Sequence, residues 1–255
     1  MPFFSPTDHH TITPRDFREI DPAVNANLPS VPQIMSCKAP DFLWAVEQLK
    51  EMGYTEVNLN LGCPSGTVTA KGKGSGMLRD IDALDAFLEE IFRDSALPVS
   101  VKTRIGFSDA EEFPKLMEIF NRYPIKELTI HPRTRKQFYS GGLAMEQFEY
   151  AVQNSTNPLC FNGDILSKTD ISELSNQYPS IDAVMIGRGL IASPGMLTPD
   201  GTTPEKLQKF MDELLDEYTL AFGGSRNAMF RLKENWGLIL PRYPHCEKLG
   251  KKLRK

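Results

Sequence analysis

The sequence predicts an α/β protein of the TIM (β/α)8-type barrel class, followed by a small helical domain. Short apolar runs rich in Val and Ile alternate with helical patterns through the first 199 residues, and such alternation indicates a parallel sheet. Seven of these runs occur, which favours a barrel over an open sheet. After Pro199 the strand pattern stops and only helical periodicity remains. These observations also set the predicted domain boundary.

The predicted strands are short and separated by segments long enough to cross over the sheet. Parallel strands need such connections, because a tight hairpin can only join antiparallel neighbours. In chain order, the predicted strands cover residues 3–5, 31–35, 56–61, 98–105, 127–131, 159–162 and 183–187.

Helical spacing of apolar residues fills several of the intervals between strands. Residues 41–52 place apolar side chains on one face, and Gly53 suits the C-terminal cap of that helix. Residues 81–92 and 111–121 repeat apolar side chains at the same helical spacing. These three segments are predicted to be helices that cover the sheet.

The last quarter of the chain predicts two helices. Thr203 and Pro204 are typical of an N-cap and a first helical position, and the glycines from Gly223 end the apolar stripe that follows. A second helix is predicted over 226–240, before Pro241. The predicted domains are therefore a barrel over 1–199 and a helical domain over 200–255.

Composition excludes several protein classes. The chain has 255 residues, 40% hydrophobic and 24% charged, without an apolar run near the roughly 20 residues that span a bilayer. We therefore expect a soluble protein with no membrane contact, and nothing implies a protein partner. The four cysteines form no C-x-x-C pair, which argues against zinc and disulfides and favours the cytoplasm. No metal is predicted.

Charge is distributed unevenly along the chain. The net charge is −4, yet residues 230–255 hold eight Lys or Arg against two Glu, a local charge of +6. A basic C-terminal segment on an acidic body is typical of a surface that binds a polyanion. A solvated helix face is the alternative interpretation of the same pattern.

Polar residues gather where the predicted strands end, which is where barrels place their active sites. Lys102 lies in the otherwise apolar run VSVKTRI, and a buried lysine is costly unless it meets an anion or a polarisable ligand. Pairing with Asp164 is the alternative. His131 ends the next strand, beside a basic loop, although a structural hydrogen-bonding role is commoner for a lone histidine.

Two glycine-containing loops after the last strands are candidates for phosphate binding. They are Asn162-Gly163-Asp164 and Gly187-Arg188-Gly189, in the position where barrels commonly bind phosphate. Glycines allow backbone N–H groups to approach the phosphate, and an arginine adds a charge-assisted hydrogen bond. Tight turns without a ligand are the alternative. The region 66–76 lacks the spacing of a Walker loop or a dinucleotide fingerprint.

Cys63 stands between Gly62 and Pro64 at the end of a predicted strand. A free cysteine is often only a small apolar residue, but this position faces the barrel mouth. Thiols in model peptides have a pKa of about 8.5, so a protonated thiol is available as a general acid at neutral pH. His9 and His10 accompany no ligand set and are predicted to lie in a solvated loop.

Taken together, these segments resemble the tRNA-dihydrouridine synthase family. The NLNLGCP run with the later K-x-x-G-S-G is the most specific part of the likeness. The matching segments are VPQI (31–34), NLNLGCPSGTVTAKGKGSG (58–76), VKTRIG (101–106), LTIHPRTRKQFYSG (128–141), FNGDI (161–165) and VMIGRGLIASPG (184–195).

The resemblance implies a fold, an activity and a site. It implies an FMN-dependent TIM barrel with a C-terminal helical domain, which reduces the C5–C6 bond of uridines in tRNA with electrons from NADPH. Hydride would pass from the flavin to C6, and Cys63 would protonate C5. By resemblance, FMN would be held by Gln33, Lys102, His131, Asn162, Gly163, Asp164, Gly187 and Arg188. Asn60 would face the uracil, while the glycine-rich flexible loop with Lys71, and the basic loop with Arg133 and Arg135, would contact RNA.

The beginning of the chain departs from the family pattern. Family members open with a strand of the type A-P-M-x-G-V-T, whereas MPFFSPTDHH resembles their second strand. We therefore expect a barrel that lacks its first βα unit, and a helical domain shorter than usual. Two alternatives follow: an impaired RNA-binding fragment, or an FMN barrel oxidoreductase that acts on a small pyrimidine.

Overall fold

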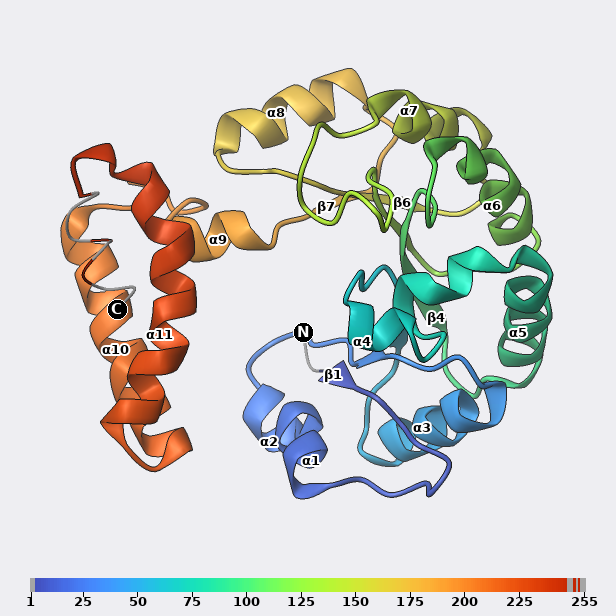
Figure 1. Cartoon of the computed structure of the whole chain (residues 1–255), viewed down its shortest axis with the longest axis horizontal. Helices are drawn as coiled ribbons and strands as arrows, with labels where there is room; N and C mark the ends of the chain where they lie inside the picture. Colours follow the sequence, from blue (N-terminus) through green and yellow to red (C-terminus); the bar gives the residue numbers. More distant parts are fainter. Residues whose placement is uncertain (1–2, 247–249, 251, 253–255) are drawn as a thin grey trace. The chain divides into compact units, whose positions relative to one another are not determined.

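The computed structural model describes residues 3–246, 250 and 252 of the chain (Figure 1). Contacts divide it into two compact units. Unit 1 comprises Met1–Gly163 and Ser180–Val184, and unit 2 comprises Asp164–Pro179 and Met185–Lys255. The boundary predicted between residues 199 and 200 separates a barrel from a helical domain by their functions. A division by contacts does not test it, and it stays a prediction.

The sheet contains seven strands in the order β1-β2-β3-β4-β5-β6-β7. Each neighbouring pair from β1–β2 to β5–β6 is parallel. The strands are β1 (Phe3–Phe4), β2 (Gln33–Ile34), β3 (Val57–Leu61), β4 (Val99–Arg104), β5 (Leu128–His131), β6 (Leu159–Asn162) and β7 (Ala183–Met185). All seven predicted strands are therefore present, and several are shorter than their apolar runs.

Helices lie outside the strands of unit 1 (Figure 1). Three match the predicted segments closely: α3 (Ala39–Glu51), α5 (Ile81–Asp94) and α6 (Phe113–Phe120), which continues from the short η2 (Ala110–Glu112). The side chain of Asp80 caps the first turn of α5 by accepting from Ala83 N at 3.0 Å. The helices α1 (Pro14–Ile20), α2 (Pro22–Asn25) and α7 (Met145–Asn154) were not assigned from the sequence.

The core of unit 1 lies between the sheet and these helices. All five residues of β3 are buried, although two of them are asparagines. The buried face of α5 consists of Leu84, Phe87, Leu88 and Ile91, the apolar positions of its helical repeat. Because the hydrophobic effect favours removing this face from water, the periodicity in the sequence was sufficient to place the helix.

The glycine-rich segment after Cys63 folds into short helical turns. It forms α4 (Gly66–Thr69) and the 3-10 helix η1 (Gly74–Arg79), whose first five residues are buried. Glycine serves close packing here: a Cβ on Gly76 would lie 2.9 Å from the carbonyl oxygen of Thr69. Lys73 turns inward and donates to the carbonyl oxygen of Pro6 at 2.9 Å.

Unit 2 contains the predicted C-terminal helix pair. α10 (Pro204–Phe222) and α11 (Ser225–Ile239) pack around Met211, Leu232 and Ile239. Thr203 caps α10 as predicted, and Gly223 ends it with a φ of +69°, a left-handed conformation that favours glycine. The remaining elements are α8 (Lys168–Gln177), α9 (Arg188–Ala192), η3 (Leu240–Arg242) and η4 (Pro244–Cys246).

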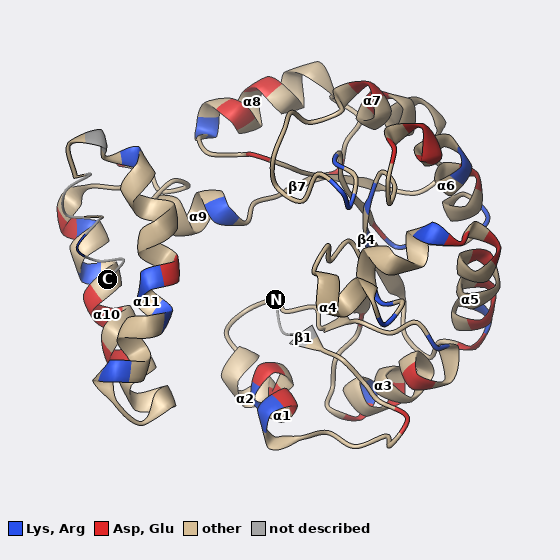
Figure 2. Cartoon of the chain, viewed as in Figure 1, with Lys and Arg blue, Asp and Glu red and all other residues tan. Residues whose placement is uncertain are grey.

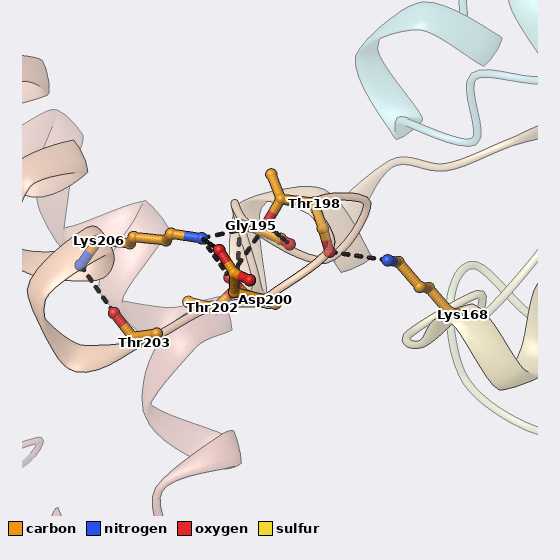
Figure 3. A network of polar contacts seen from close by, with 8 residues as sticks. Lys168, Gly195, Thr198, Asp200, Thr202, Thr203 and Lys206 are labelled. Carbon is orange, nitrogen blue, oxygen red and sulfur yellow. Dashed lines mark hydrogen bonds and ion pairs between the residues drawn. The ribbon is translucent and has the colours of Figure 1, made fainter.

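A polar network fixes the segment that leads from α9 into α10 (Figure 3). Lys168 Nζ on α8 donates to the carbonyl oxygen of Thr198 at 2.7 Å, and Lys206 Nζ lies 3.3 Å from Asp200 Oδ2. The backbone N–H of Gly195 donates to Thr202 Oγ1 at 2.9 Å. This connection is therefore held to α8 and to the first turn of α10. Within the described part of the chain, no helix has the length and apolar character needed to cross a membrane.

Candidate functional site

A chain of side-chain amides crosses the interior of the sheet at β2, β3 and β4. Asn58 Nδ2 donates to Ser100 Oγ at 3.0 Å, and Asn58 Oδ1 accepts from Gln33 Nε2 at 2.8 Å. Gln33 Oε1 then accepts from Asn60 Nδ2 at 2.6 Å. Buried amides require hydrogen-bond partners, and here each side-chain amide is a partner of the next one in the chain. This chain brings together two predicted site residues, Gln33 and Asn60.

The amide chain ends at the backbone of Cys63. Asn60 Oδ1 accepts from the N–H groups of Gly62 and Cys63, at 3.0 and 2.9 Å. On the other side, the carbonyl oxygen of Cys63 accepts from the backbone N–H of Ser75 at 3.1 Å and from its hydroxyl at 2.8 Å. Cys63 itself is half-buried. Its backbone is therefore fixed from two directions.

Two arginines hold the carbonyl groups on either side of Cys63. Arg104 Nε donates to the oxygen of Gly62 at 2.8 Å, and Arg135 Nε donates to the oxygen of Pro64 at 3.2 Å. Arg104 is 1% exposed, and burial lowers the pKa of its guanidinium. Since each neighbour of the cysteine is bound by a charged donor, the segment has little freedom to shift.

Lys102 on β4 is the second feature of the site. Its ammonium donates to Asn162 Oδ1 at 2.8 Å, across to the end of β6. Burial, reinforced by the positive charge of Arg104, lowers the pKa of Lys102 to about 8. Burial also raises the pKa of the neighbouring Cys160 to about 12, so that thiol stays protonated. A buried cation hydrogen-bonded to a neutral amide suits an anionic ligand.

The basic loop after β5 turns inward more than the sequence suggested. His131 and Arg133 are 5% and 3% exposed, and Arg133 donates to the carbonyl oxygen of Gly141 at 2.9 Å. Arg133 Nη1 also lies 3.2 Å from His131 Nε2. In this arrangement Arg133 supports the loop from inside. By contrast, Lys71 after α4 is exposed.

The predicted phosphate loops are divided between the two units. Gly163 ends the first segment of unit 1, and a Cβ there would lie 2.9 Å from Leu143 Cδ2. In unit 2, Arg188 Nη2 donates to Asp164 Oδ1 at 2.8 Å. Both side chains are partly exposed, at 44% and 38%. Gly187 stands at the N-cap of α9, and a Cβ added to it would meet open space. The sharing of one ligand by both sets of residues stays a prediction.

Sequence reasoning gave no role to Arg104, Ser75 or Gly74, which together shape the surroundings of Cys63. The signal for Arg104 was available. It lies two residues after Lys102 in an apolar strand, and residues two apart point to the same face. For Ser75 and Gly74 the sequence offered no comparable signal, because their contacts with Cys63 depend on how α4 and η1 fold back.

The family model described as "Dihydrouridine synthase (Dus)" matches residues 6–234. The chain belongs to the dihydrouridine synthase family. The predicted family is thereby confirmed, and the parallel sheet with C-terminal helices agrees with the predicted barrel class.

Several relatives in the dihydrouridine synthase family share about a third of their aligned residues with this chain. A probable tRNA-dihydrouridine synthase of Staphylococcus aureus is 36% identical over 172 residues, which cover 65% of this chain and 52% of the relative. One of Staphylococcus epidermidis is 35% identical over 171 residues, with the same coverage. Probable tRNA-dihydrouridine synthase 1 of a Synechocystis strain is 33% identical over 191 residues, covering 73% of this chain and 52% of the relative. The chain spans about half the length of the relatives it matches.

Proposed function

We propose that this chain reduces uridine to 5,6-dihydrouridine in tRNA, the activity for which its relatives are named. The observation that carries the proposal is the arrangement around Cys63. Hydrogen bonds hold the backbone of the half-buried Cys63 and of both its neighbours after the end of β3, and the half-buried Lys102 lies on the adjacent strand. A tRNA-modifying role makes a cytoplasmic location part of the same proposal.

The residues of unit 1 fit a flavin. The pairing of Lys102 with a neutral amide leaves its positive charge uncompensated by that partner, and a reduced flavin ring is an anion. In unit 1, FMN would be held by Gln33, Lys102, His131, Asn162 and Gly163. When bound, FMN reduced by NADPH supplies the hydride for C6 of the uracil.

Cys63 supplies the proton. The thiol holds a proton at Sγ and gives it to C5 as negative charge develops there, so hydride and proton together saturate the C5–C6 bond. Asn60 contributes by accepting from the N–H of Cys63, and its side chain would face the uracil. Hydrogen bonding on both sides of the cysteine holds its backbone in place, which lowers the entropy lost on reaching the transition state.

RNA contact is proposed for basic residues of each unit. In unit 1 these are Lys71 and the half-buried Arg135, with Arg133 supporting the loop from within. In unit 2, α11 carries Arg226, Arg231 and Lys233 against Glu234, whereas α10 is predominantly acidic (Figure 2). The phosphate backbone would therefore meet α11. Of the predicted basic tail, Lys248, Lys251, Arg254 and Lys255 lie outside the described residues.

The test begins with the visible absorption spectrum of the purified chain, before and after addition of FMN. We expect a flavin band that bleaches with NADPH, and dihydrouridine in tRNA after incubation with both. Lys102→Ala and Arg188→Ala are expected to weaken FMN binding. RNA binding without a flavin band would support an impaired RNA-binding fragment instead, and consumption of free uracil but not tRNA would support a small-pyrimidine reductase.

A further inference from the structure

A ladder of alternating arginine and phenylalanine side chains lies beside the Cys63 segment. The guanidinium carbon of Arg79 stands 4.1 Å from the ring centroid of Phe107, and that of Arg135 stands 5.3 Å from the same centroid. Arg135 also lies 5.5 Å from the ring centroid of Phe138. The order of the ladder is therefore Arg79, Phe107, Arg135 and Phe138, with each contact in the range of a cation–π interaction.

The ladder ends at an exposed aromatic ring. Phe138 is 41% exposed, whereas Phe107 is half-buried and covered by two guanidinium groups. A large apolar ring at the end of a stack gains nothing from water, and its outer face is suited to a further planar group. The adjacent Tyr139 is 54% exposed, so the aromatic surface extends along the loop.

The backbone holds Phe138 in an unfavourable conformation to present this ring. Its φ is +55°, a left-handed value that costs a bulky non-glycine residue about 1–2 kcal/mol. The buried Arg104 stabilises it, because Arg104 Nη1 donates to the carbonyl oxygen of Phe138 at 2.6 Å. Strain of this kind, retained by a buried charged donor, is concentrated at functional positions.

Arg135 joins the ladder to the Cys63 segment. The same guanidinium that stacks between two rings donates to the oxygen of Pro64, next to Cys63. Both arginines are positively charged, and the nearby Glu112 carboxylate is occupied by the backbone N–H groups of residues 107–109. An aromatic surface with fixed positive charge next to it matches a nucleobase and its phosphate.

We propose that an unpaired base of the RNA substrate, next to the target uridine, stacks on Phe138 and continues the ladder. The proposal rests on the proposed function, because it takes the RNA to be the substrate whose uridine reaches Cys63. Stacking on the ring would hold the neighbouring nucleotide while the target base leaves the helical stack. The platform binds a base of any identity, because every base has a π-face.

The protein test compares Phe138→Leu with Phe138→Trp in the full chain. Both substitutions keep a Cβ, so the strained backbone is the same, while leucine loses the aromatic face and tryptophan keeps it. Phe17→Leu on α1 is the matched control, since Phe17 is 45% exposed and lies outside the ladder. Affinity for a fluorescently labelled tRNA transcript would be measured by anisotropy over a series of salt concentrations.

We expect Phe138→Leu to weaken binding between about 5-fold and 150-fold, the range of base–aromatic stacking, without changing the salt dependence. Phe138→Trp and Phe17→Leu should bind as the unaltered chain does. Equal binding by Phe138→Leu and the unaltered chain would overturn the proposal. A loss equal to that of Phe17→Leu, or one that appears only as a changed salt slope, would overturn it as well.

The RNA test removes the base instead of the ring. A set of transcripts would carry a single abasic site at each nucleotide near the modified uridine, identified beforehand from the position of dihydrouridine. At one of these positions the unaltered chain should lose the same affinity as Phe138→Leu, and the two changes together should cost no more than either alone. Full additivity at every position would overturn the stacking proposal while leaving the proposed function intact. Absence of any tRNA binding by the unaltered chain would overturn both.

Discussion

Arg104 Nε lies 2.8 Å from the carbonyl oxygen of Gly62 and so binds the residue that precedes Cys63. The same guanidinium donates through Nη1 to the carbonyl oxygens of Thr134 at 2.9 Å and Phe138 at 2.6 Å. One buried side chain thus joins the segment after β3 to the loop after β5. The fork geometry of arginine makes this possible, and a single ammonium group cannot reproduce it.

Arg104→Lys is therefore expected to loosen the Cys63 segment. The substitution keeps the charge but leaves at least one buried carbonyl without its donor, at a cost of about 1–3 kcal/mol in the free energy of unfolding. Alkylation of each cysteine by iodoacetamide, followed by mass spectrometry, would show faster modification of Cys63. The half-buried Cys37 serves as the internal control. An unchanged Cys63 rate with normal stability would contradict the positioning role.

Cys63→Ala is expected to remove most dihydrouridine formation and to leave FMN bound. General acid catalysis contributes about 10²-fold to 10⁴-fold to a rate, and alanine has no proton to give. Cys160→Ala is the comparison, because that cysteine is 2% exposed and lies on β6, a strand that does not pair with β3. Turnover would be measured on tRNA with equal flavin loading. Full activity of Cys63→Ala would exclude its role as the acid.

The strands and the longer helices were predictable because burial alone selects them. The apolar run of β4 and the helical repeat of α5 place the same residues in the core that the sequence pattern indicates. The fold of the segment 66–79 was not predictable, since its glycines are consistent with a flexible loop. Only contacts from distant residues, such as Lys73 with Ser5 and Pro6, show that the segment is packed.

The sequence identified several residues of the candidate site, but few of the hydrogen bonds between them. Cys63 and Lys102 could be identified from strand-end positions that are unusual for a thiol and a lysine. The role of Asn60 in holding Cys63 could not, because a hydrogen bond between a side chain and a backbone N–H depends on the turn that follows the strand. Arg133 and Arg135 were grouped as one basic loop, yet one is buried and the other enters the aromatic ladder.

Lys102→Met is expected to stabilise the flavin-free chain at neutral pH. Burial lowers the pKa of Lys102 in the folded state to about 8, from an ordinary value of 10.5. Below pH 8 the lysine is charged in both states, so the folded state bears the whole cost of burying the ammonium. Between pH 8 and 10.5 the folded state has released the proton that the unfolded state still binds, and stability rises with pH.

The gain from Lys102→Met should therefore be greatest below pH 8, up to about 3 kcal/mol, and should fade toward pH 10.5. Urea unfolding followed by tryptophan fluorescence at pH 7 and pH 10 would measure it. The same variant should lose affinity for FMN. A stability difference that is independent of pH would show that burial does not lower the pKa of Lys102 in the folded state.

Gly74→Ala is expected to disturb Cys63 directly, and Gly72→Ala provides the matched control. Both glycines have a left-handed φ, +57° for Gly74 and +69° for Gly72, so alanine costs each about 1–2 kcal/mol in backbone conformation. They differ in their surroundings. A Cβ on Gly74 would lie 2.9 Å from the carbonyl oxygen of Cys63, whereas the nearest atom to a Cβ on Gly72 is Cys37 Sγ at 3.9 Å.

Because Gly74→Ala adds a steric conflict with the backbone of Cys63, it should destabilise the chain more than Gly72→Ala by about 1–3 kcal/mol. It should also lower dihydrouridine formation per folded molecule, since the displaced carbonyl is the one that Ser75 holds. Thermal unfolding and turnover would be measured on both variants at equal flavin occupancy. Equal stability and equal turnover would mean that the close approach of Gly74 does not set the position of the thiol.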